Sequence, residues 1–387
     1  MAVPSSAPLA VAMTVEQLWQ PVPGGSGTYI VELASALGQL PEVRVVGLAA
    51  AHRSGPPADL RPPVPVRHAP LPRRLLYDAW NHTGLPRAEH LLWGRLDVVH
   101  ATTWAVPPTR RPLVVTVHDV AFLRDPSHFT SRGVRFFTRA LARTRAEADV
   151  VIVPSEATAV DCVDAGIERS RLAVVPQGVR VSRPAPEQVA GFRATHGLDR
   201  PYLLWTGTRE PRKNLRGLLA AFELLADVEP DLDLVLVGPD GWGEAADGVH
   251  PEIAARVHHL GRLGWPELQL AYAGARVFCF PSLWEGFGLP VLEAMGHGVP
   301  VVTSAGTSMA EVVGDAGLLV DPRDPSAIAG AIGRALGADH DRLSRAGLAR
   351  AAAATWQRVA EATVGVYRAA IDGRRAHGAA GRNAPRG

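Results

Sequence analysis

The sequence predicts an α/β protein built from two domains, each a parallel sheet covered by helices. The chain has 387 residues, a length that suits two α/β domains of roughly 190 residues each. Hydrophobic residues make up 47% and charged residues 20% of it, so both domains can bury a core. Short apolar and β-branched runs alternate with helical patterns throughout, which is typical of parallel strands joined by helices.

The first domain is expected to cover residues 1–182. Leu9 to Met13 predicts a buried strand, followed by a glycine-containing loop and a helix with Ile30, Leu33 and Leu37 on its apolar face. Apolar runs predict further strands at 45–50, 97–99, 113–117, 150–153 and 172–175. The stretch from 182 to about 200 is polar with several prolines, and this predicts the domain boundary.

The second domain is expected over residues 200–353. Its strands are predicted at 202–205, 234–237, 277–280, 299–303 and 317–320. Asn214 is expected to cap a helix with Leu215, Leu218 and Phe222 on one face. A last helix is expected over 354–371. The tail 372–387 is expected to be disordered, because from residue 373 it carries four arginines and no acid.

Composition excludes several classes of protein. The formal net charge of +2 gives no reason to expect nucleic-acid binding. Cys162 and Cys279 lie far apart and outside any Cys-x-x-Cys pair, which predicts neither a disulfide framework nor a zinc site. Pro4 and Pro8 interrupt a start that has no basic run, so no signal peptide is expected, and no apolar run approaches the ~20 residues of a membrane span. A cytoplasmic location is therefore expected.

A glycine-rich segment, residues 23–28, follows the first predicted strand. In open α/β sheets ligands bind at the carboxyl ends of strands, and Gly25 and Gly27 would let the backbone approach an anion there. The segment lacks the dinucleotide-binding fingerprint, because Ile30 stands where its third glycine belongs. A tight turn without ligand is the alternative.

His118 directly follows the strand predicted at 113–117. A lone histidine is more often structural than catalytic, but the carboxyl end of a buried strand is where functional side chains gather. His118 is therefore a candidate for catalysis. His100 holds a similar position without other support and is interpreted as structural.

Arg212 and Lys213 lie between a predicted strand and a predicted helix, after Gly207. Cations at a helix N-terminus oppose the helix dipole, so the pair requires a compensating partner. A diphosphate would serve. A solvated basic loop is the alternative.

Two glutamates separated by seven residues, Glu285 and Glu293, flank another strand-to-helix connection. The segment between them begins Gly286-Phe287-Gly288-Leu289. Carboxylates accept hydrogen bonds from sugar hydroxyls, and two at this spacing can contact two different sugar rings. Asp231-Leu232-Asp233 resembles a metal-binding Asp-x-Asp, but it runs directly into a predicted strand, so no metal is assigned.

These segments resemble family-4 retaining glycosyltransferases of the GT-B fold, in which two Rossmann-like domains face each other across a cleft. The resemblance covers most of the chain and is strongest from Val150 to Pro322. Its most specific parts are the Glu-x(7)-Glu motif and Glu210-Pro211-Arg212-Lys213-Asn214. The sequence departs from the family at Gln177, where Asn is more usual, and at His297, where a small residue or cysteine is commoner.

The resemblance implies a role for each matched residue. Arg212 and Lys213 correspond to the pair that holds the donor diphosphate, Glu285 to the acid that contacts the transferred sugar, and Glu293 to the acid that binds the ribose. His118 corresponds to a histidine near the donor sugar. The donor-binding set also includes Gly25, Gly27, Gly207, Gly286, Phe287, Gly288 and Leu289.

The expected reaction is transfer of a hexose from a nucleotide diphosphate sugar with retention of anomeric configuration and without metal or other cofactor. The resemblance favours GDP-mannose, with a UDP-sugar carrying glucose or N-acetylglucosamine as the alternative donor. The acceptor is expected to be a glycan, a lipid-linked molecule or a small molecule. A non-catalytic two-domain ligand-binding protein is a further alternative, but it gives no reason for His118, Arg212 and Glu285 to occur together.

A basic helix is predicted around residues 132–143. Arg132, Arg135, Arg139 and Arg143 recur at helical spacing beside two phenylalanines. A solvated arginine face is the favoured interpretation. The alternative is peripheral contact with the inner membrane face, because such a helix can lie on an anionic membrane, which would suit a lipid-linked acceptor.

Overall fold

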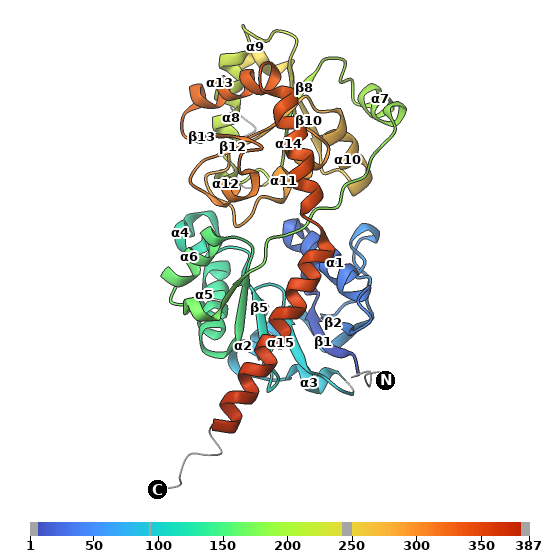
Figure 1. The fold of residues 1–387 in the computed structure, drawn as a ribbon, viewed down its shortest axis with the longest axis vertical. Helices are drawn as coiled ribbons and strands as arrows, with labels where there is room; N and C mark the ends of the chain where they lie inside the picture. Colours follow the sequence, from blue (N-terminus) through green and yellow to red (C-terminus); the bar gives the residue numbers. More distant parts are fainter. Residues whose placement is uncertain (1–6, 93, 242–249, 381–387) are drawn as a thin grey trace, which may run out of the picture. The chain divides into compact units, whose positions relative to one another are not determined.

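The structure is a computed structural model that describes residues 7–92, 94–241 and 250–380. Its chain divides into two compact units (Figure 1). Unit 1 comprises residues 1–177 and 356–387, and unit 2 comprises residues 178–355. Each unit contains one parallel sheet, which confirms the predicted α/β class.

Unit 1 contains a seven-stranded sheet in the order β3-β2-β1-β4-β5-β6-β7. Every neighbouring pair is parallel. The strands are β1 (Leu9–Thr14), β2 (Val43–Ala51), β3 (Val66–Pro72), β4 (Val98–Ala101), β5 (Leu113–Thr116), β6 (Val150–Val153) and β7 (Leu172–Val174). The order reverses between β1 and β4, and in doubly wound sheets such a switch point is where ligands bind.

Seven α-helices belong to the described part of unit 1. They are α1 (Gly24–Gly38), α2 (Arg73–His82), α3 (Ala88–Leu91), α4 (Ala121–Arg124), α5 (Ser131–Glu147), α6 (Glu156–Asp164) and α15 (Trp356–Ala380). Short 3₁₀ turns occur at Glu16–Trp19, Ala58–Leu60, Pro126–His128 and Arg169–Arg171. The central strands β4 and β5 are buried along their whole length, as expected for strands covered on both faces.

Helix α15 returns from the end of unit 2 to pack on α1 and on strands β4, β5 and β6 of unit 1 (Figure 1). Tyr367 of this helix meets His100, whose Nδ1 lies 2.7 Å from the tyrosine oxygen, while His100 Nε2 lies 2.7 Å from Thr116 Oγ1. These contacts give His100 a structural role. The helix extends to Ala380, so residues 372–380 are helical and not disordered as the sequence suggested. The remainder of the predicted tail lies outside the described residues.

Unit 2 contains a six-stranded parallel sheet in the order β10-β9-β8-β11-β12-β13. Its strands are β8 (Tyr202–Thr206), β9 (Asp233–Val237), β10 (Val257–Gly261), β11 (Val277–Phe280), β12 (Val301–Ser304) and β13 (Leu318–Val320). The order reverses between β8 and β11. The connections that carry Arg212 and Glu285 follow these two neighbouring strands.

The helices of unit 2 are α7 (Pro186–Thr195), α8 (Leu215–Leu225), α9 (Pro251–Ala254), α10 (Trp265–Gly274), α11 (Leu289–Gly296), α12 (Ser308–Val313), α13 (Pro325–Leu336) and α14 (His340–Ala353), with a 3₁₀ turn, η5, at Pro211–Lys213. Helix α7 packs against α10, so residues 186–195 belong to unit 2. The sequence placed them in a linker because their polar residues hide a helix with one buried side chain, Phe192.

The strands that the sequence did not predict, β3 and β10, form edges of the two sheets. Most of their side chains are exposed or only partly buried. An edge strand with little buried surface has no continuous apolar run to reveal it. Among the described helices, none has the length and apolarity needed to cross a bilayer.

Candidate functional site

The connection from β8 to α8 begins with a close approach of two backbones. Gly207 has φ +152° and its N–H donates to the carbonyl of Val237 at 2.9 Å. A Cβ on Gly238 would lie 1.9 Å from the Gly207 oxygen, so a side chain there would force the two loops apart. The glycines therefore allow the ends of β8 and β9 to lie against each other.

Arg212 and Lys213 then form the 3₁₀ turn η5 that precedes α8. The backbone carbonyl of Arg212 accepts a hydrogen bond from the N–H of Leu283, at 2.8 Å, which joins this turn to the loop after β11. The turn is thus attached to the same loop that carries Glu285.

Asn214 does not cap α8 with its side chain, contrary to the sequence prediction. It adopts a left-handed conformation, φ 53°, and its Nδ2 donates to the carbonyl oxygens of Pro281 at 3.0 Å and Pro322 at 2.6 Å. The amide therefore connects the loops that follow β8, β11 and β13. It positions the loop that carries the basic pair instead of satisfying the helix.

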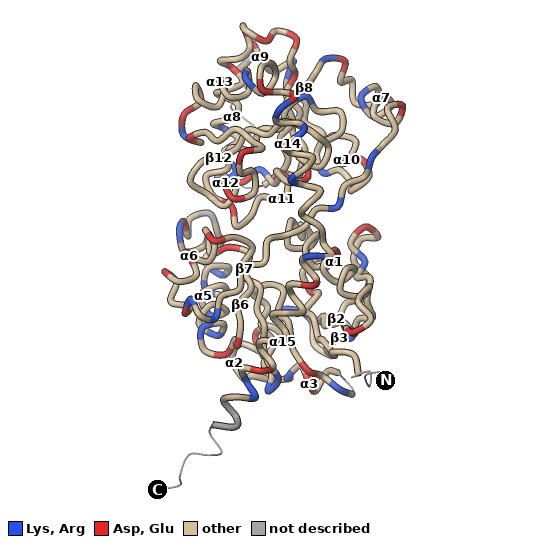
Figure 2. Tube along the Cα trace, viewed as in Figure 1, with Lys and Arg blue, Asp and Glu red and all other residues tan. Residues whose placement is uncertain are grey.

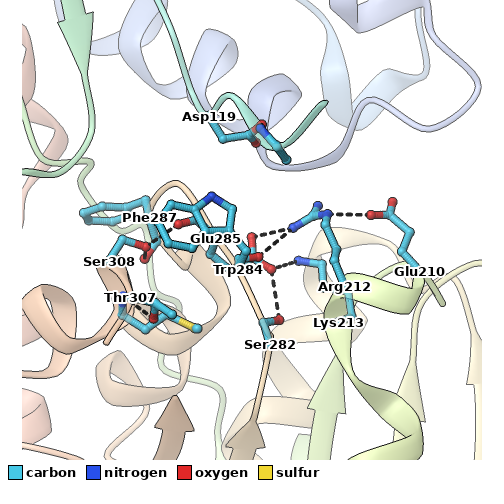
Figure 3. Close-up of polar contacts among 12 residues, drawn as sticks. Asp119, Glu210, Arg212, Lys213, Ser282, Trp284, Glu285, Phe287, Thr307 and Ser308 are labelled. Atoms are coloured by element: carbon cyan, nitrogen blue, oxygen red, sulfur yellow. Dashed lines mark hydrogen bonds and ion pairs between the residues drawn. The ribbon is translucent and has the colours of Figure 1, made fainter. Parts of the chain in front are cut away.

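Glu285 forms ion pairs with both basic side chains of η5 (Figure 3). Its Oε2 lies 2.9 Å from Arg212 Nη1, and its Oε1 accepts from Lys213 Nζ at 2.5 Å. Ser282 Oγ donates to the same Oε1 at 3.0 Å. Arg212 Nε also donates to Glu210, at 2.8 Å, so the guanidinium lies between two carboxylates. The sequence predicted the three charged residues but not that they contact one another.

Two of the three charges of this cluster are buried, and that of Arg212 is partly buried. Lys213 is 9% exposed and Glu285 is 8% exposed. Burial by itself would raise the pKa of Glu285, but the adjacent Arg212 and Lys213 outweigh it and lower that pKa to about 2. Burial lowers the pKa of Lys213, and the Glu285 carboxylate opposes this effect. The carboxylate is therefore ionised at neutral pH and balances part of the positive charge of Arg212 and Lys213.

The segment after Glu285 turns sharply into α11. Gly288 precedes the helix with φ +106°, a left-handed conformation that favours glycine. Ser308 Oγ donates to the backbone oxygens of Glu285, at 2.6 Å, and Phe287, at 3.2 Å. The hydroxyl of Ser308 therefore fixes the turn formed by Gly286, Phe287, Gly288 and Leu289. Nothing in the local pattern around Ser308 indicated this role.

Glu293 lies in the second turn of α11 and is partly buried. Tyr272 donates its hydroxyl hydrogen to Glu293 Oε2 at 2.9 Å, and the tyrosine oxygen lies 2.9 Å from Thr206 Oγ1 at the end of β8. Tyr272 therefore links the second glutamate to the strand that leads to the basic pair. No pattern in the sequence indicated Tyr272, because its partners lie on other elements.

His118, Gly25 and Gly27 belong to unit 1. His118 Nε2 donates to the Thr102 carbonyl at 3.0 Å, and Gln177 Nε2 lies 3.4 Å from His118 Nδ1. Burial lowers the pKa of His118, so the ring is neutral at neutral pH. Its role near a donor sugar stays a prediction. Gln177, one of the departures from the family pattern, contacts this histidine.

Gly25 and Gly27 lie within the first turn of α1, which begins at Gly24, so they belong to the helix and not, as the sequence suggested, to a loop before it. A Cβ on Gly27 would lie 2.6 Å from the Cβ of Pro23. The glycine is required by this contact. Binding of an anion by this turn stays a prediction.

Asp233 occupies the start of β9, where its Oδ2 accepts from His258 Nε2 at 3.0 Å. This confirms that Asp231-Leu232-Asp233 leads into a strand. Over residues 7–92, 94–241 and 250–380, no three His, Cys, Asp or Glu side chains are grouped so that they could hold one metal ion.

Two family models match the chain. The model described as "Glycosyltransferase Family 4" matches residues 23–183, and the one described as "Glycosyl transferases group 1" matches residues 200–338. The two matches correspond to unit 1 and unit 2 respectively, and the second includes Arg212, Lys213, Glu285 and Glu293.

Several characterised proteins are similar along most of their length. The O-antigen chain mannosyltransferase B of Escherichia coli is 32% identical over 283 residues, which cover 70% of this chain and 74% of that protein. The D-inositol 3-phosphate glycosyltransferase of Streptomyces griseus subsp. griseus is 30% identical over 409 residues, covering 91% of this chain and 86% of that protein. The crystal structure of Anabaena HepE in complex with UDP and glucose has a TM-score of 0.70 and 20% identity, with 92% of this chain and 98% of that chain covered, so the two share a fold.

Proposed function

This chain belongs to glycosyltransferase family 4, with the two parallel-sheet units of the GT-B fold, and we propose that it transfers a hexose from a nucleotide diphosphate sugar. The transfer retains the anomeric configuration and needs no divalent metal. The acceptor is a glycan, a lipid-linked molecule or a small molecule. The single observation that carries this proposal is the cluster of Arg212, Lys213 and Glu285 at the carboxyl ends of β8 and β11.

The cluster suits the charge change of such a reaction. The bond from the sugar C1 to the diphosphate oxygen breaks, and its electron pair stays on the diphosphate. The acceptor hydroxyl oxygen bonds to C1, and its proton passes to the departing diphosphate. Arg212 and Lys213 stabilise the negative charge that develops, and fixed cations in a buried site do so without solvent reorganisation.

Glu285 and Glu293 have separate tasks in this proposal. Glu285 orients the transferred sugar through its hydroxyls and, by its own charge, keeps the cations of Arg212 and Lys213 paired. Glu293 accepts hydrogen bonds from the ribose of the nucleotide, since Tyr272 holds one of its oxygens in place. Each carboxylate retains acceptor capacity beyond its contacts in the protein.

Mannose is the first choice for the sugar, with GDP-mannose as donor, because the E. coli relative is named a mannosyltransferase. A UDP-hexose is the alternative donor, because HepE of the same fold was crystallised with UDP and glucose. The distinction depends on contacts with the base.

Thermal unfolding with GDP, UDP, GDP-mannose and UDP-glucose in the presence of EDTA tests the donor site. A ligand at a hundredfold excess over its dissociation constant stabilises the folded state by about 2.7 kcal/mol. One nucleotide family should stabilise the natural chain, whereas Arg212→Ala and Glu293→Ala should lose that stabilisation. Arg216→Ala is the matched control, because Arg216 is exposed on α8.

The proposal is contradicted if no nucleotide at millimolar concentration moves the melting temperature, or if Arg212→Ala responds like the natural chain. Once a donor is identified, proton NMR of the product gives the anomeric configuration. Inversion would overturn the retaining mechanism, and loss of turnover in EDTA that magnesium restores would overturn metal independence.

A further inference from the structure

Unit 1 contains a cavity of about 1090 Å³, lined only by residues of that unit. Helices α2 and α5 form much of its wall, and His118 and Asp119, after β5, line it as well. Pockets for drug-sized ligands occupy about 300–1,000 Å³. The cavity is therefore large enough for a substantial part of an acceptor.

Five arginines line this cavity: Arg73 and Arg74 of α2, and Arg132, Arg135 and Arg139 of α5. The acidic side chains in the lining are two, those of Asp78 and Asp119. Blue segments mark the arginines along α5 in Figure 2. The lining therefore carries an excess of positive charge, although the chain as a whole is close to neutral with a formal charge of +2.

Four of these arginines, Arg73, Arg74, Arg132 and Arg135, form no hydrogen bond or ion pair with any described residue. The contrast is Arg143, farther along α5, which pairs with Glu147 at 2.9 Å and donates to the Val106 carbonyl at 2.7 Å. These four arginines of the cavity wall thus form no polar contact that the fold requires. Guanidinium groups recognise phosphate oxygens by paired hydrogen bonds, and a ligand phosphate would supply the missing partners.

The same wall is also aromatic. Tyr77 stacks on Phe136 with ring centroids 5.5 Å apart, and Phe137 packs against Phe122 at 5.4 Å. Trp104 meets Phe122 edge to face at 5.6 Å. All five rings line the cavity. An aromatic surface of this kind stabilises a bound apolar group, because burial of apolar surface contributes about 25 cal/mol per Å² removed from water.

We propose that the cavity binds an acceptor in which a phosphate or diphosphate is joined to an aliphatic chain. This inference rests on the proposed function, because it assigns the acceptor of that reaction. The arginines bind the phosphate oxygens and the aromatic side chains pack against the first part of the chain. Arg132, Arg135 and Arg139 of the basic helix are exposed, and together with Phe136 and Phe137 they line this cavity.

Calorimetric titration of the full chain with geranyl diphosphate tests this assignment. Inorganic diphosphate, geraniol and glucose 1-phosphate serve as probes of the separate parts. Geranyl diphosphate should bind at least about tenfold more tightly than any of the three, since it alone engages both parts of the wall. All titrations are repeated in Arg212→Ala, so that the proposed donor-diphosphate loop does not contribute.

The double variant Arg132→Ala/Arg135→Ala should weaken geranyl diphosphate binding by at least about tenfold. Arg44→Ala is the matched control, since Arg44 is exposed on β2 and outside the cavity. Equal binding of glucose 1-phosphate would overturn the apolar part of the assignment. Unchanged binding in the double variant, or binding that disappears in Arg212→Ala, would overturn the site. The nucleotide melting experiment reports on unit 2, so its success alongside failure here would refute the acceptor and leave the transferase standing.

Discussion

Replacing Glu285 by glutamine tests the charge balance of the buried cluster. The substitution keeps the size of the side chain and removes its negative charge. Arg212 and Lys213, which now lie 2.9 and 2.5 Å from the carboxylate oxygens, would then face a neutral amide. Removal of one partner from a buried ion pair is strongly destabilising because the remaining charge is left without compensation.

The size of the effect follows from the pKa of Glu285. The two cations lower that pKa from its ordinary value of 4.5 to about 2, and at 1.36 kcal/mol per pKa unit this corresponds to about 3 kcal/mol. A domain the size of unit 2 loses roughly 2–4 °C per kcal/mol. We therefore expect the melting temperature at pH 7.5 to fall by roughly 6–12 °C.

The measurement is calorimetric unfolding from pH 7.5 down to acid. Because the folded-state pKa of Glu285 is lowered, its stabilisation is fully present above pH 4.5 and is lost as the pH falls through about 2. The difference between the two proteins should shrink in that window. Glu223→Gln, on the exposed face of α8, is the control and should change little.

A double variant separates the electrostatic explanation from a packing effect. Glu285→Gln/Lys213→Met removes both charges, so it should recover part of the stability lost by Glu285→Gln alone. A melting temperature for Glu285→Gln within about 2 °C of the natural chain would refute the reasoning. So would a double variant that is less stable than the two single effects combined.

Three other substitutions test individual contacts. Gly288→Ala should lower the free energy of unfolding in urea by about 1–3 kcal/mol, because φ +106° strains any residue with a Cβ. Gly330→Ala is the control and should not destabilise, since Gly330 lies in open space within α13. Equal effects of the two substitutions would contradict the argument from backbone conformation. Tyr367→Phe should cost about 1–3 kcal/mol, since it removes a hydrogen-bond partner of buried His100; an unchanged urea midpoint would contradict this. Burial lowers the pKa of His297 to about 4, so the unfolded state binds more protons between pH 6.5 and 4, and stability falls as the pH falls through that window. In a pH series, His297→Gln should therefore reduce the dependence of the melting temperature on pH. An identical pH dependence in the two proteins would refute this prediction.

The sequence predicted those parts of the fold that depend on burial. Strands such as β8 and β11 are fully buried, and their continuous apolar runs identified them. The edge strands β3 and β10 were missed because they bury few side chains. Helix α7 was placed in a linker for the same reason, since its position depends on packing against α10 and not on a strong apolar face of its own.

The site was predictable by residue type but not by contact. Arg212, Lys213 and Glu285 each stood out at the end of a strand, yet the ion pair between Lys213 and Glu285 joins residues 72 positions apart. Asn214 has the chemistry of a helix cap, but its side-chain amide donates instead to two carbonyl groups of other loops. Tyr272 and Ser308 could not be found, because their partners are set by the arrangement of the whole sheet.

The division of the chain has a consequence for its synthesis. Unit 2 is one continuous stretch, whereas unit 1 is completed only by α15 at the end of the chain. A nascent chain emerging from the ribosome can therefore finish folding unit 2 while strands β4 to β6 still lack the helix that covers them and His100 still lacks Tyr367. A stop codon after residue 355 would leave the second unit whole and the first one open, although every strand of both sheets had been made.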